Sequence, residues 1–238
     1  MSYYGFAPYV SVAEKRAKAD RQIAKLKKKN PDLAPVLTES NTIARSWWGK
    51  AWNKNLESYA DYANRISRGK SYVRNHAVLD LQIREGSVEA LVQGTGSKPY
   101  VIEVEIDVLG EKRWRQVVNL CNHRIDSVEK LVEGKFPKEL EVIFTEKEYG
   151  MFPSPKEIHF SCSCPDYAYM CKHVAAVLYG VGARLDEDPL LFFTLRRVDI
   201  QDLIRRSVEN RMDAMLKNAA KKSGRAMSET EMHDVFGI

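Results

Sequence analysis

Cysteine and histidine residues are concentrated in one short stretch of this chain. Cys162 and Cys164 are separated by one residue, as are Cys171 and His173, so three of the four cysteines and one of the five histidines lie within twelve residues. Three thiolates and one imidazole form a complete tetrahedral shell for Zn²⁺. Since such a shell leaves no position for water, the sequence predicts a structural zinc site and not a catalytic one.

The residues around this cluster predict how the chain holds it. Residues 158–160 are typical of a short strand that enters the cluster, and Pro165 stops that strand after Cys164. An apolar helix is expected to follow, with Cys171 just before it and His173 in its first turn. The positive end of this helix would then point at the anionic sulfur cluster.

Other uses of these residues are less favoured. A disulfide or redox pair between Cys162 and Cys164 would leave Cys171 and His173 without a role. His159 is a second candidate for the imidazole ligand, but its expected place on the incoming strand favours His173. Cys121 is followed two residues later by a histidine, but no further ligands lie near it, so we expect it in the core.

The sequence carries no signal for export or membrane insertion. Its N-terminal residues lack a basic segment followed by an apolar one. The apolar run at 174–183 is too short to cross a bilayer, which needs about 20 residues. Clustered cysteines in such a chain indicate a metal site in a reducing compartment and not a disulfide frame. We therefore expect a cytoplasmic protein that does not enter a membrane.

The apolar pattern predicts an α+β fold. A period of two predicts strands over 78–83, 88–92 and 100–106, and the short turns between them indicate an antiparallel meander. Periods of three and four predict helices, and residues 67–71 are expected to form a basic turn. The helices are expected over 11–29, 46–66, 114–120, 126–133, 138–149, 174–180 and 199–222. The result is an antiparallel sheet flanked by helices, with a small zinc-bound β-hairpin-plus-helix finger toward the C-terminus.

Four domains or segments are expected along the chain. They are a basic N-terminal helix or arm at 1–44, an α+β domain with the meander at 45–155, the zinc finger at 156–196, and a basic C-terminal helix and tail at 197–238. Within the second, Trp48 and Trp52 fall on the apolar stripe of a helix and are expected in the core. Trp47 lies off that stripe, so a base-stacking role for it stays open.

Charge is unevenly distributed along the chain. The net charge is +6 over residues 11–30, +5 over 45–74 and +5 over 196–225, while residues 75–160 carry −4. Solvated helix faces would explain any one basic segment, but their separation from an acidic middle suits a phosphate backbone or an acidic partner. The candidate nucleic-acid contacts are Lys15, Arg16, Lys25, Lys27, Lys28, Arg68, Lys70, Arg74, Lys172, Arg205 and Arg206.

The metal motif resembles the SWIM zinc finger. The resemblance rests on residues 160–167 (FSCSCPDY) and 171–178 (CKHVAAVL), which are similar to its Cys-x-Cys and Cys-x-His pattern. Residues 44–52 (ARSWWGKAW), 68–72 (RGKSY) and 188–192 (DPLLF) are similar to bacterial stand-alone SWIM proteins. The resemblance implies Zn²⁺ bound by Cys162, Cys164, Cys171 and His173, together with DNA binding or protein interaction. It also implies an association with Swi/Snf-type helicase-like ATPases.

The leading hypothesis is a non-enzymatic zinc protein that binds nucleic acid, with DNA as the expected ligand, as an accessory to such an ATPase. The sequence contains no catalytic triad, phosphate loop or paired acid and base that would indicate an enzyme. The alternative is a protein–protein adaptor whose zinc finger is purely structural. In that case the acidic middle and the apolar run at 190–195 would form its contact surface.

Overall fold

A four-stranded antiparallel sheet organises the computed structural model of this chain. The structure describes residues 10–38, 42–58, 63–121, 130, 135, 138–166 and 168–219. Within them the strands follow the order β1-β2-β3-β4. They are β1 (Val78–Arg84), β2 (Ser87–Val92), β3 (Tyr100–Ile106) and β4 (Ile158–Cys162). The predicted α+β class and the predicted meander are confirmed.

The strand that enters the metal cluster belongs to this same sheet. β4 pairs with β3, and the register sets Phe160 opposite Val104 and Cys162 opposite Ile102. Ile102 and Val104 are buried on one face, while Glu103 and Glu105 are exposed on the other. The period of two therefore sends Cys162 to the covered face, at the end of a strand whose position the neighbouring strand fixes.

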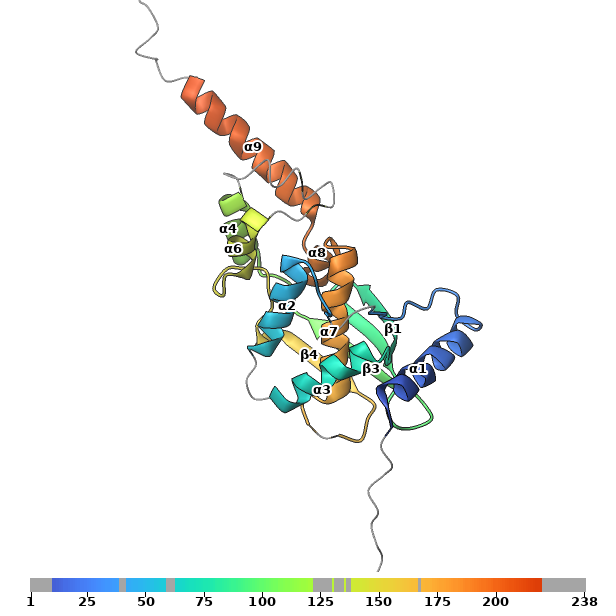
Figure 1. Ribbon diagram of the computed structural model, residues 1–238. Coiled ribbons are helices and arrows are strands. Elements are labelled where there is room, and N and C mark those ends of the chain that lie inside the picture. Colours follow the sequence, from blue (N-terminus) through green and yellow to red (C-terminus); the bar gives the residue numbers. More distant parts are fainter. Residues whose placement is uncertain are drawn as a thin grey trace, which may run out of the picture.

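Helix α7 (Lys172–Glu187) lies on the covered face of the sheet and is buried along most of its length. On its other side it packs against α2 (Trp47–Glu57) and α3 (Ala63–Arg74), as Figure 1 shows. Small residues make this double contact possible. A Cβ atom added to Gly180 would lie 2.6 Å from Leu81 in the sheet, and one added to Gly182 would lie 2.5 Å from Asn53 on α2.

Helix α1 (Val12–Lys27) lies against the other face of the sheet. Ala19 and Ile23 are buried beside Leu79 of β1. A capping box between Ser11 and Glu14 begins the helix. Of the two forms expected for this basic segment, the structure therefore has the docked surface helix.

The remaining helices lie toward the end of the sheet at which β3 ends and β4 begins, and they extend beyond it. They are α4 (Glu111–Cys121), η2 (Lys138–Leu140), α6 (Glu141–Thr145), η3 (Pro155–Glu157), α8 (Leu191–Arg196) and α9 (Ile200–Ala219). α9 begins beside α4 and projects away from the rest of the molecule (Figure 1). In the described part of the chain, no helix is both long enough and apolar enough to cross a membrane.

Several local expectations are corrected. The single helix expected over 46–66 is two helices, since α2 ends at Glu57 and α3 begins at Ala63. The turn expected at 67–71 lies inside α3, because Gly69 there serves a close helix contact and not a turn. The helix expected over 138–149 ends at Thr145. Apart from residue 130, the helix expected over 126–133 lies outside the described residues, and so does the tail from Ser223.

The run at 190–195 belongs to the core. Phe192, Phe193 and Leu195 are buried, which confirms that this run docks on the core and leaves these three side chains inaccessible to a partner. One continuous core also spans residues on both sides of the expected boundary at 155/156, from Trp52 to Leu203. The division into four domains stays a prediction, and the sheet and the core cross this boundary.

Candidate metal centre

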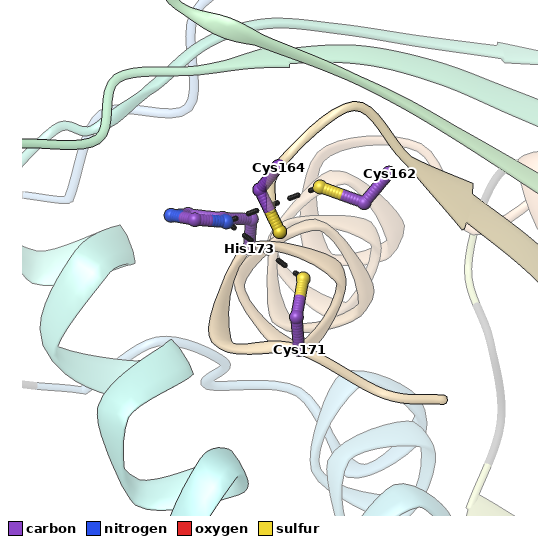
Figure 2. Close-up of side chains that lie close together, drawn as sticks. All are labelled: Cys162, Cys164, Cys171 and His173. Carbon is purple, nitrogen blue, oxygen red and sulfur yellow. Dashed lines mark hydrogen bonds between the residues drawn. The ribbon is translucent and has the colours of Figure 1, made fainter. Parts of the chain in front are cut away.

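Three consecutive pieces of backbone bring the predicted ligands together. Cys162 is the last residue of β4, and Cys164 lies in the turn that follows. Cys171 is the N-cap of α7, and His173 is in the first turn of that helix. The four ligand atoms all lie within 4.8 Å of one another. Figure 2 shows the three sulfur atoms grouped beside one edge of the imidazole ring.

The spacing of these atoms fits a zinc ion. His173 Nδ1 lies 3.9 Å from Cys162 Sγ and 3.7 Å from Cys171 Sγ. In a tetrahedron with Zn–S bonds of about 2.3 Å and a Zn–N bond of about 2.0 Å, neighbouring ligand atoms are roughly 3.5–3.8 Å apart. The side chains therefore need little movement to hold the ion, and Nδ1 is the imidazole nitrogen that would bind it.

The start of α7 favours a negative charge on Cys171. The backbone N–H of Val174 donates to Cys171 Sγ at 3.5 Å. The pKa of the Cys171 thiol is lowered by hydrogen bonding from Cys162, and further by His173 and Val174, although burial opposes this. The N-terminus of a helix stabilises an anion in the same way. Zinc would hold the other two cysteines as thiolates as well.

Two tyrosines enclose the imidazole. The ring centroid of His173 lies 4.5 Å from that of Tyr100 and 5.2 Å from that of Tyr72. His173 is only 2% exposed, and its Nε2 atom has no hydrogen-bond partner among the described residues. Packing therefore fixes the orientation of the His173 ring. In many other zinc sites a hydrogen bond from the second ring nitrogen of the histidine does this.

The loop between Cys164 and Cys171 is tied to α3. Asp166 accepts a hydrogen bond from Arg65 at 2.5 Å and another from the N–H of Ala168 at 3.2 Å. The pKa of Asp166 is lowered by the Ala168 N–H and by Arg65. The Tyr169 ring packs against that of Phe160 at a tilt of 45°, with ring centroids 4.6 Å apart. These contacts fix the loop that joins the two halves of the ligand set.

The rejected ligands lie elsewhere. His159 projects from the other face of β4, where Nε2 is 3.2 Å from Asp107 Oδ1. Cys121 is buried in α4 and is not part of the cluster. The structure thus brings together the four residues predicted from the spacing and leaves out the two alternatives.

Of the tryptophans in α2, two bind α7. Trp48 Nε1 donates to the carbonyl oxygen of Leu185 at 2.7 Å, and Trp52 Nε1 donates to that of Leu178 at 2.8 Å. Both are structural, as predicted. Trp47 is partly buried and contacts Trp48 edge to face, with ring centroids 5.6 Å apart.

The predicted nucleic-acid contacts are divided between two ends of the molecule. Arg16 on α1 and Arg74 on α3 meet, because the Arg16 guanidinium donates to the Arg74 carbonyl at 2.8 Å. Lys70 pairs with Glu57 at 2.7 Å. The other residues of this half lie exposed or half-buried on α1 and its C-cap, on α3 and at the start of α7; they are Lys15, Lys25, Lys27, Lys28, Arg68 and Lys172.

Arg205 and Arg206 lie apart from this group. They are on α9, at the opposite end from α1 (Figure 1). Both pair with Asp202, at 2.6 and 2.8 Å. Hydrogen bonds from Trp114, Arg206 and Arg205 lower the pKa of Asp202 to about 2, which keeps its carboxylate charged. The structure therefore does not join all three basic segments in one surface.

The fold and site define a zinc-binding protein with a closed Cys₃His centre. Residues 159–181 match the family model of the SWIM zinc finger, and the chain therefore carries a SWIM zinc finger. The chain is also 36% identical over 172 residues to the uncharacterized protein Rv2102 of Mycobacterium tuberculosis. That match covers 72% of this chain and 62% of the relative, less than two thirds of its length. No solved structure gives a significant match.

Proposed function

We propose that this protein is a non-enzymatic module that uses its zinc finger to hold a nucleic-acid-binding surface, with DNA as the ligand. One observation carries the proposal: the Arg16 guanidinium donates to the backbone carbonyl of Arg74, 58 residues away in sequence, and so ties α1 to the end of α3. A basic helix and the end of a basic second helix are thereby joined. Phosphate backbones are bound by such groups of arginine and lysine side chains.

The zinc site supports a structural role. Three thiolates and one imidazole fill the tetrahedral shell, so no position remains at which zinc would activate water. The ion would instead hold the end of β4 against the start of α7. Arg68 is exposed on α3, which packs along α7, and Lys172 lies between two ligands. The finger thus orients cations without taking part in a reaction. Thiols kept as metal ligands also suit the reducing cytoplasm.

The association with a Swi/Snf-type helicase-like ATPase belongs to the same proposal and rests on the resemblance to SWIM proteins.

A second candidate function, a protein–protein adaptor, is favoured by α9. Apolar side chains recur along one side of this helix and are about half exposed or more; they are Val208, Met212, Met215 and Leu216. An exposed apolar stripe of this kind is typical of a surface that binds another protein.

Binding to a duplex oligonucleotide across a salt series tests the proposal. The zinc-loaded protein should bind, and log K should fall with log[salt] with a slope of about −4 if some four to five phosphates are contacted. The exposed pair Lys25→Glu/Lys27→Glu should weaken binding and reduce this slope. The matched control, Lys112→Glu/Lys156→Glu, makes the same charge change on the acidic middle segment and should bind as the wild type does. No binding at low salt would overturn the proposal.

A further inference from the structure

Two hollows flank the exposed side of α2. The larger has a volume of about 720 Å³ and lies between α2 and the segment that contains η2 and α6. Its lining includes Trp47, Phe152 and four lysines: Lys50, Lys54, Lys138 and Lys147. None of these lysines is among the contacts predicted from sequence, because they come from two segments that only the fold brings together.

The charge of the larger hollow is strongly positive. Its four lysines are exposed, and Glu141 is the acid in its lining. Among the described residues, no salt bridge occupies any of these four ammonium groups. Such a surface attracts anions, and at this size it accommodates more than a single phosphate.

The smaller hollow continues this surface across α2. It has a volume of about 270 Å³ and shares Lys50 and Lys54 with the larger one. Lys70 and Arg74 are on its far side. Its acid, Glu57, is engaged by Lys70 at 2.7 Å and by the Tyr179 hydroxyl at 2.9 Å. A positive strip therefore runs from Lys147 over α2 to Arg74, where it meets Arg16.

Trp47 contributes a partly buried indole ring to the lining of the strip. Its two neighbours in α2, Trp48 and Trp52, direct their indole N–H groups at carbonyls of α7. Trp47 instead lines the larger hollow, held edge to face by Trp48. An aromatic ring among lysines is the combination by which proteins bind single-stranded nucleic acid, since unpaired bases stack on the ring while cations contact the backbone.

We propose that this strip binds single-stranded nucleic acid, with a base stacked on Trp47 and phosphates beside Lys50 and Lys54. The proposal rests on the proposed function and specifies the form of its ligand. In a duplex the faces of the bases are covered by their neighbours, so only an unpaired strand presents a base face to Trp47. An acidic peptide would satisfy the lysines but would leave the indole without a matching partner.

Fluorescence anisotropy with the zinc-loaded full chain tests this. The probes are a fluorescein-labelled 12-nucleotide oligothymidine and a duplex of the same length, each measured over a salt series. Trp47→Ala should weaken binding of the single strand by about tenfold, because stacking on one base contributes that order of affinity, and Trp47→Phe should restore part of it. Lys50→Glu/Lys54→Glu should lower the slope of log K against log[salt] by about 1.4, since each phosphate contact to a single strand contributes about 0.7.

The controls separate the possible outcomes. Lys112→Glu/Lys156→Glu should bind like the wild type, and zinc content and thermal melting should show that every variant is folded. If Trp47→Ala and Lys50→Glu/Lys54→Glu bind the single strand as tightly as the wild type does, the strip is not the binding site, although the proposal of nucleic-acid binding stands. Equal losses for single strand and duplex would overturn the single-strand preference. Displacement of the oligonucleotide by polyglutamate at matched charge would assign the strip to acidic peptides. A wild type that binds neither probe would overturn the proposed function as well.

Discussion

Gly69 of α3 lies directly against Ala175 of α7. A Cβ atom added to Gly69 would be 2.7 Å from the Cβ atom of Ala175 and 2.8 Å from its carbonyl carbon. The two helices thus approach almost to backbone contact, two residues after the last zinc ligand. Because α3 also carries Arg65, which holds the loop of the finger, this contact links the zinc site to the rest of the core.

Gly69→Ala should therefore destabilise the protein. The added methyl group meets backbone atoms that cannot rotate away, and overpacking of this kind costs about 1–3 kcal/mol. Alanine recovers up to about 1 kcal/mol through its higher helix propensity, so we expect a net loss of about 1–2 kcal/mol in the free energy of unfolding, measured by denaturant titration. Gly96→Ala is the control, because a Cβ atom there meets no atom within 4 Å. Equal stability of the two variants would contradict the close contact.

Removal of one ligand should abolish stoichiometric zinc binding. The zinc-loaded wild type should contain one zinc ion per chain by elemental analysis, and Cys171→Ala should lose at least most of it, because three remaining ligands no longer close the shell. Cys121→Ala is the matched control, since Cys121 is buried away from the cluster. It should retain one zinc ion per chain even if its stability falls. If the Cys121 variant lost zinc while the Cys171 variant kept it, Cys171 would not be a zinc ligand and the proposed ligand set would be wrong.

The ion pair between Glu157 and Arg196 should make stability depend on pH in the acid range. Arg196 is fully buried and donates to Glu157 at 2.6 Å. Burial alone would raise the pKa of Glu157, but hydrogen bonds from Arg196 and from the N–H of Ser154 outweigh it and lower the pKa from 4.5 to about 2. The pair therefore contributes stability that is complete above about pH 4.5 and is lost as the pH falls toward 2.

Glu157→Gln tests this contribution. At neutral pH it should lower the free energy of unfolding by about 3 kcal/mol, which corresponds to the shift in pKa. The difference from the wild type should shrink as the pH falls from 4.5 to 2. Acid also releases zinc from its thiolates, so the two proteins are compared at each pH and both are loaded with zinc at the start. Glu148→Gln, at an exposed position, should follow the wild type throughout. A difference that stays constant with pH would exclude the ion pair as its source.

The contact between Arg65 and Asp166 should slow the loss of zinc. Asp166→Asn removes the charge that holds the finger loop on α3. Because the pair is partly exposed, the effect should be modest, and we expect zinc transfer to a colorimetric chelator to become about two- to fivefold faster. Arg184→Gln, which disrupts an ion pair at the far end of α7, is the control. Unchanged transfer in the Asp166 variant would mean that the loop is held by packing alone.

The zinc ligands and the first three strands were predictable from local sequence. Ligand spacing and alternating burial are properties of neighbouring residues, so Cys171 could be placed at the start of a helix and Ile102 on the covered face of a strand. The pairing of β4 with β3 was not predictable. The residues that pair are more than 50 positions apart in sequence, and a strand of five residues carries little information about register.

Gly69 illustrates why one helix that ends before residue 67 was expected in place of α2 and α3. In sequence a glycine between Arg68 and Lys70 is typical of a turn, but in the structure it is helical and serves the contact with Ala175. The strip across α2 was missed for a related reason. Lys50 and Lys138 are 88 residues apart, and their common hollow exists only because α6 packs near α2.

X-ray absorption at the zinc edge of the native protein tests the central claim most directly. We predict three sulfur ligands at about 2.3 Å and one nitrogen ligand at about 2.0 Å, with no oxygen in the first shell. Such a spectrum would establish the closed Cys₃His site that holds β4 to α7. A first shell that contains water or fewer than three sulfurs would contradict it.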